Sequence, residues 1–133
     1  MAKFTSAKHQ HLIQDSLFQK SFLSFTGKFN WLHFAKDCMI TIVFPAGLRE
    51  NQHVLAYWQW DVDAKGMHSK AEPKGVIDVL GKSTKPPYIR FFKDNYYWFE
   101  GEILDSEKVI NLTMWDKTQK TRSSFQVALS FSK

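Results

Sequence analysis

The chain has 133 residues, of which 44% are apolar, 16% aromatic and 23% charged, with a formal net charge of +5 at pH 7. This length predicts one domain with its own core, and the aromatic content favours strands over helices. Cys38 is the only cysteine, which excludes an intrachain disulfide and a zinc site built of thiolates. The first residues lack the apolar run of a signal peptide, and no continuous apolar segment is long enough to span a membrane. These features predict a cytoplasmic protein that does not enter a membrane.

The charges are unevenly distributed along the chain. Residues 64–93 contain seven Lys or Arg and two acids, whereas residues 94–116 contain one Lys and six acids. Proteins that bind nucleic acid usually show one continuous basic surface. Here neighbouring segments of opposite sign can pair with each other across strands. The pattern therefore disfavours nucleic acid as a partner.

The N-terminal part predicts one helix, over residues 7–20. Ser6 can cap it, and the segment contains no Gly or Pro. Its apolar side chains gather on one side: Leu12, Ile13, Leu17 and Phe18. This helix is short and must pack on another element.

Strand-like segments follow at short intervals, separated by residues typical of turns. They cover 28–34, 38–44, 53–61, 75–80, 88–93, 96–104, 109–115 and 124–132. About eight strands at this spacing predict a mainly β fold, either a small antiparallel barrel or a strongly bent sheet, with one N-terminal helix. We find no linker, so residues 1–133 are expected to form a single domain.

Two assumed turns give a register for the last strands. A two-residue turn at Asp94-Asn95 would place Phe92 opposite Tyr97, and a four-residue turn over 105–108 would place Ile103 opposite Ile110. One face is then apolar: Phe92, Tyr97, Phe99, Ile103, Ile110, Leu112 and Met114, joined by Phe125, Val127, Leu129 and Phe131. The other face mixes aromatic and polar groups: Phe91, Tyr96, Trp98, Glu100, Glu102, Asn111, Thr113, Trp115, Ser124, Gln126 and Ser130.

The mixed face resembles the lining of a ligand pocket, because tryptophans stand among carboxylates, an amide and hydroxyls. It would form either the lumen of a barrel with an apolar outside or an exposed concave surface of a bent sheet with an apolar core. The segment AYWQWDVD adds Trp58 and Trp60, which share one face of their strand. The predicted ligand-binding residues are Trp98, Glu100, Glu102, Asn111, Thr113, Trp115, Trp58 and Trp60.

No motif in the sequence predicts a metal, a cofactor or a catalytic residue. His9 and His11 lie two residues apart, whereas metal-binding histidines on a helix lie three or four apart. The carboxylate pairs Asp61/Asp63 and Glu100/Glu102 could serve acid–base chemistry, but solvation or pairing with Arg90 and Lys93 explains them more simply.

Two short motifs resemble the calycin barrels, the avidin type in particular. Thr26-Gly27-Lys28-Phe29 is similar to the Gly-x-Trp start of the family's first strand, with Phe in place of Trp. The segment 110–115, Ile-Asn-Leu-Thr-Met-Trp, is similar to its penultimate strand, whose Trp stacks on the ligand. The resemblance implies a barrel with Trp115 in its lumen and an outer face available for subunit association. It does not extend to biotin, because residues 126–133 lack the acid that completes the ligand cage.

The leading hypothesis is a non-catalytic binding protein for a small, partly aromatic or cationic molecule. Trp98 and Trp115 would stack on this molecule, and Glu100 or Glu102 would select positive charge. The alternative is a protein-interaction module, either a homodimer or a higher oligomer, that uses the same aromatic residues as its interface. A third hypothesis is a small acid–base enzyme.

Overall fold

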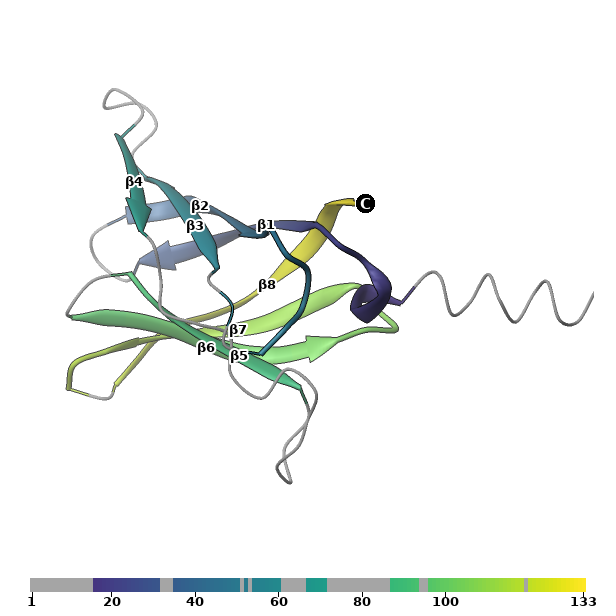
Figure 1. The fold of residues 1–133 in the computed structure, drawn as a ribbon. Helices are drawn as coiled ribbons and strands as arrows, with labels where there is room; N and C mark the ends of the chain where they lie inside the picture. The colour runs from purple at the N-terminus through teal and green to yellow at the C-terminus, as the bar shows by residue number, and fades with distance from the viewer. Residues whose placement is uncertain are drawn as a thin grey trace, which may run out of the picture.

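A computed structural model describes residues 16–31, 35–50, 52, 54–60, 67–71, 87–93, 96–118 and 120–133. Within them, antiparallel strands form one sheet in the order β4-β3-β2-β1-β8-β7-β6-β5 (Figure 1). The strands are β1 (Leu23–Trp31), β2 (Ala35–Phe44), β3 (Leu55–Trp60), β4 (Met67–Ala71), β5 (Tyr88–Phe92), β6 (Tyr97–Leu104), β7 (Val109–Asp116) and β8 (Thr121–Ser132). The predicted mainly β, antiparallel fold is confirmed.

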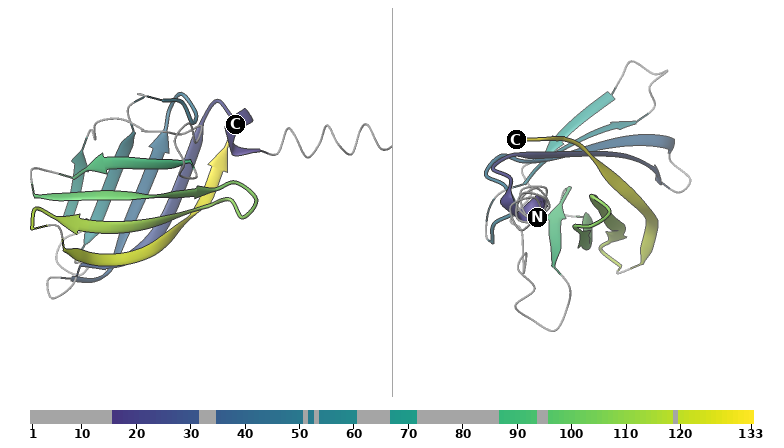
Figure 2. Two further views of the ribbon diagram at one scale, coloured as in Figure 1. Left: turned by 90° about the horizontal axis from the view of Figure 1, so that it is seen from below. Right: turned by 90° about the vertical axis from the view of Figure 1, so that its right-hand side faces the viewer.

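The sheet is strongly curled into a half-barrel, so that its two halves face each other. In Figure 2 the strands β5 to β8 pass across the strands β1 to β4. The two halves are joined where β1 pairs with β8, from Leu23 opposite Ser132 to Thr26 opposite Ala128. An irregularity in this pairing, between Ser24 and Phe25, adds to the local twist that turns the sheet.

The core lies between the two halves of the sheet. Alternate side chains of β2 point inward: Cys38, Ile40, Ile42 and Phe44. Trp58 of β3 packs with its ring centroid 6.3 Å from that of Phe91 and 5.7 Å from that of Phe99, and these two phenyl rings stack at 5.2 Å. The apolar face is therefore the inside of the curl, and the opposite face of each half is the outside of the molecule.

The predicted N-terminal helix, over residues 7–20, is wrong at its C-terminal end, which is the part of it that the structure describes. Residues 7–15 of the predicted helix lie outside the described residues, and Leu17–Gln19 form a single 3₁₀ turn. The side chain of Ser16 accepts a hydrogen bond from the N–H of Phe18, and Lys20 is already extended. Leu17 is fully buried in the core, so tertiary packing positions this turn.

The predicted strands match β2, β3 and β5 to β8 to within a few residues, whereas β1 begins at Leu23, five residues before the predicted strand 28–34. The predicted strand 75–80 lies outside the described residues, and β4 was not predicted. The pairing of β5 with β6 is shifted by one residue, because Phe92 lies opposite Trp98 and the N–H of Lys93 donates to the carbonyl of Tyr97 at 3.0 Å. The loop between them thus has three residues instead of two. The two faces of β5 are therefore the reverse of the prediction: Phe91 is buried and Phe92 is 40% exposed.

The β6–β7 pairing is as predicted, with Ile103 opposite Ile110 across the turn at 105–108. Asp105 in this turn also holds the N-terminal segment. Its carboxylate accepts hydrogen bonds from the N–H of Leu17 at 2.6 Å and the hydroxyl of Ser16 at 2.9 Å, and Lys108 approaches to 3.4 Å. Burial raises the pKa of Asp105, but the hydrogen bonds and Lys108 outweigh this effect and hold the pKa below its ordinary value.

This interaction predicts a pH dependence of stability. Because the pKa of Asp105 is lower in the folded than in the unfolded chain, its contribution is complete above the unfolded pKa of about 4 and is lost as the pH falls through the lower, folded value. Asp105→Asn should therefore flatten the loss of unfolding free energy between about pH 5 and pH 3, as measured by urea denaturation at each pH. Ser106→Ala, at an exposed residue of the same turn, should leave the wild-type slope because it removes no titrating group. Parallel slopes for Asp105→Asn and wild type would contradict the role of Asp105.

Candidate functional site

The outer face of β5, β6 and β7 carries a row of three aromatic side chains. Phe92, Trp98 and Trp115 come from adjacent strands, because Phe92 is paired with Trp98 and Trp98 with Trp115. The indole centroids lie 6.5 Å apart with their planes only 11° from parallel, and the ring of Phe92 lies 6.4 Å from that of Trp98 at 45°. The pairing of the three strands thus places these rings side by side.

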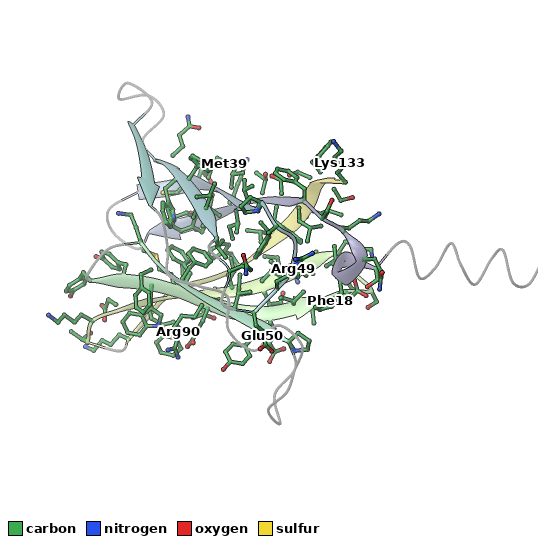
Figure 3. The ribbon with its side chains drawn as sticks, in the orientation of Figure 1. Phe18, Met39, Arg49, Glu50, Arg90 and Lys133 are labelled. Atoms are coloured by element: carbon green, nitrogen blue, oxygen red, sulfur yellow. The ribbon has the colours of Figure 1, made fainter. Side chains whose placement is uncertain are left out.

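An ion pair stands directly beside this row. Arg90 and Glu100 are cross-strand partners, and the Nε of Arg90 donates to Oε2 of Glu100 at 3.2 Å. Their side chains are 45% and 30% exposed, so the pair contributes little to stability, at most about 1 kcal/mol. In Figure 3 the side chain of Arg90 points away from the interior of the sheet. The pair therefore presents charge and hydrogen-bonding groups outward.

These five residues line a partly open pocket of about 400 Å³: Arg90, Phe92, Trp98, Glu100 and Trp115. The volume is in the range of pockets that hold small molecules. The indole Nε1 of Trp115 is covered by protein and has no acceptor in the described part of the chain. Trp115 therefore offers ring carbons rather than its N–H, and the polar contacts of the pocket come from Arg90 and Glu100.

Polar side chains continue from the pocket along the same outer face. One row crosses from Glu100 to Thr113 and Ser124, whose hydroxyl oxygens are 3.4 Å apart. The next row crosses from Glu102 to Asn111 and Gln126, and Gln126 Nε2 donates to Asn111 Oδ1 at 2.6 Å. Residues two apart on a strand are separated by roughly 7 Å, so the rows lie roughly 7 and 14 Å from the aromatic row.

The structure brings together six of the eight predicted ligand-binding residues on this face. Trp98, Glu100 and Trp115 line the pocket, and the others lie beyond it: Glu102, Asn111 and Thr113. Trp58 instead lies in the core, fully buried between the halves of the sheet. The side chain of Trp60 lies outside the described residues.

The face is also not where either predicted geometry put it. It is neither a lumen nor the concave side of the sheet, since the apolar residues fill the inside of the curl. Two pocket residues, Arg90 and Phe92, were missed because the assumed two-residue loop turned Phe92 inward. The alternation of β5 carried the signal: Ile89 shares a face with Phe91, whereas Arg90 shares one with Phe92.

The fold and site define a curled antiparallel sheet with a polar-aromatic pocket on its outer surface. No family model, curated protein or solved structure was found to match the chain. In the part of the chain that the structure describes, no three of the His, Cys, Asp and Glu side chains are grouped as metal ligands. The described residues also include no helix with the length and apolar character needed to cross a membrane.

Proposed function

We propose that the protein is a non-catalytic binding protein that holds a small, partly aromatic ligand in the outer pocket. The observation that carries the proposal is the pairing of two nearly parallel indoles with an ion pair in one pocket of about 400 Å³. The rings offer flat apolar area at little entropic cost, and Arg90 and Glu100 offer donors and acceptors that orient a polar substituent.

A preference for cationic ligands has less support than the aromatic part of the proposal. An indole face attracts cations, but Arg90 lines the same pocket and its charge offsets that of Glu100. We therefore expect neutral aromatic molecules to bind at least as well as cationic ones of the same size.

Three one-ring probes of different charge test this proposal: phenol, benzamidine and benzoate. We expect phenol to shift the indole NMR signals of Trp98 and Trp115, and Trp98→Ala to weaken its affinity at least about tenfold, because a stacking surface is lost. Tyr57→Ala is the matched control, because Tyr57 is an exposed aromatic residue on the outer face of the other half of the sheet. Equal phenol affinities in wild type and Trp98→Ala would refute the site.

The alternative is self-association through the same aromatic residues. Phe92 and Tyr96 are each 40% exposed at the same end of the β5–β6 hairpin, and β5 is the last described strand of the sheet. Aromatic residues exposed beside a strand edge are typical anchors of an interface. Native mass spectrometry of wild type and Trp98→Ala separates the two functions: an oligomer that Trp98→Ala converts to a monomer favours self-association, and a monomer with a stoichiometric adduct favours a pocket ligand.

A further inference from the structure

The polar rows beyond the pocket keep hydrogen-bonding capacity that the protein itself does not use. In the Asn111–Gln126 pair, one N–H of Gln126 and the carbonyl of Asn111 are engaged with each other. The Asn111 amide nitrogen and the Gln126 carbonyl oxygen have no other partner in the described structure, and both residues are exposed. A donor and an acceptor therefore stand side by side, facing outward.

The neighbouring groups extend the same pattern. Glu102 is exposed next to Asn111 and makes no hydrogen bond or ion pair with a described residue. The hydroxyls of Thr113 and Ser124 lie between this pair and the pocket, and the one hydrogen bond between them leaves one donor and three acceptor positions for a ligand. From the aromatic row outward, the face thus changes from flat rings to mixed donors and acceptors, which reach roughly 14 Å from the rings.

The charge of this face selects the kind of ligand that fits it. Arg90 offsets Glu100, and Glu102 adds one negative charge, so the described groups of the pocket and rows sum to −1. A phosphate-bearing ligand would meet one guanidinium and two carboxylates, which is unfavourable. Neutral hydroxyl groups match the rows, because each hydroxyl both donates and accepts and the amides and hydroxyls of the face offer both roles.

We infer that the ligand of the pocket carries a neutral saccharide, with a flat ring against Trp98 and Trp115 and sugar hydroxyls on the polar rows. This inference rests on the proposed binding function and names the chemistry of the part of the ligand outside the pocket. A sugar ring has an apolar face that packs on an indole and an edge of hydroxyls that pairs with amides. The order of the face, rings first and amides further out, suits an aryl glycoside or a short oligosaccharide.

The experiment uses the full chain on a printed array of neutral plant, fungal, bacterial and animal oligosaccharides, with phenol as the aromatic-only probe. We expect at least one class of glycan to be retained, and the double variant Asn111→Ala/Gln126→Ala to weaken the best glycan about tenfold or more without changing the affinity for phenol. The matched control is Thr26→Ala/Ser130→Ala, which removes the exposed cross-strand hydrogen bond from Thr26 Oγ1 to Ser130 Oγ, 3.3 Å long, together with the contacts of Ser130 Oγ to Ser24, where β1 meets β8.

The outcomes separate the two proposals. Phenol binding without any retained glycan would overturn the saccharide inference and leave the proposed pocket function standing. A glycan that binds equally well to wild type and the Asn111/Gln126 double variant would also overturn it, because the polar rows would then not contact the sugar. Absence of both phenol and glycan binding would remove the proposed function and this inference together.

Discussion

Gly101→Ala is expected to lower the free energy of unfolding by about 3 kcal/mol or more, or to prevent folding. A Cβ atom at this position would lie 1.8 Å from the carbonyl oxygen of Asn111 and 2.9 Å from the Cα of Leu112. Both atoms belong to the backbone of β7, so no side chain can rotate away to make room. Strands β6 and β7 would have to separate and lose ladder hydrogen bonds, each worth about 1 kcal/mol.

Urea denaturation followed by tryptophan fluorescence measures this effect. Glu102→Ala is the matched control, because it removes the exposed side chain next in sequence and should change stability by about 0.5 kcal/mol or less. A Gly101→Ala protein with the wild-type midpoint would contradict the close approach of the β7 backbone to Gly101. Because Trp98 and Trp115 are aligned by this same strand pair, a folded but loosened variant should also lose phenol affinity.

Much of the β5–β8 half was predictable because its apolar residues alternate consistently. In β6 and β7 the alternation leaves one acceptable register, and a four-residue turn at 105–108 puts Ile103 opposite Ile110 with the residues that become the core on one face: Phe99, Ile103, Ile110, Leu112 and Met114. This register was enough to predict that six site residues of these two strands share one face: Trp98, Glu100, Glu102, Asn111, Thr113 and Trp115. Their placement on the outer surface did not, since a face pattern does not say which way a sheet curls.

The register of β5 against β6 was predicted wrongly because two identical residues stand side by side in this strand. Phe91 and Phe92 are equally apolar, so hydrophobicity at these two positions fits either loop length. Only Ile89 and Arg90 distinguish the registers, and they favour the three-residue loop that the structure has. The Asp94-Asn95 dipeptide is a strong turn signal and outweighed this weaker one.

Pairing between strands that are far apart in the chain could not be predicted from the sequence. β1 pairs with β8 across about a hundred residues, and among the described strands this is the pairing that joins the two halves of the sheet. The inward face of β3 was equally open, because the ten residues between β2 and β3 give no register by themselves. Trp58 could thus be read as a site residue, although it lies opposite Ile40 within the core.

Trp58 and Trp98 should therefore respond in opposite ways to substitution. Trp58 is fully buried against Phe91 and Phe99, and deletion of such a side chain costs about 3–5 kcal/mol. Trp58→Phe keeps part of the contact, so we expect a folded protein that is about 1–3 kcal/mol less stable in urea and binds phenol as wild type does. Trp98 is half-buried on the outer face, so Trp98→Ala should cost about 1 kcal/mol of stability and most of the phenol affinity.

The comparison tests the assignment of the two tryptophans independently of what the natural ligand is. Each variant is measured twice, by urea midpoint and by phenol titration monitored through the indole NMR signals. If Trp58→Phe lowered phenol affinity as strongly as Trp98→Ala while leaving the midpoint unchanged, the binding site would lie inside the curl of the sheet. The opposite pattern, a lower urea midpoint for Trp58→Phe and a lower phenol affinity for Trp98→Ala, places recognition on the outer face, where Trp98 lies, and not in the core, where Trp58 lies.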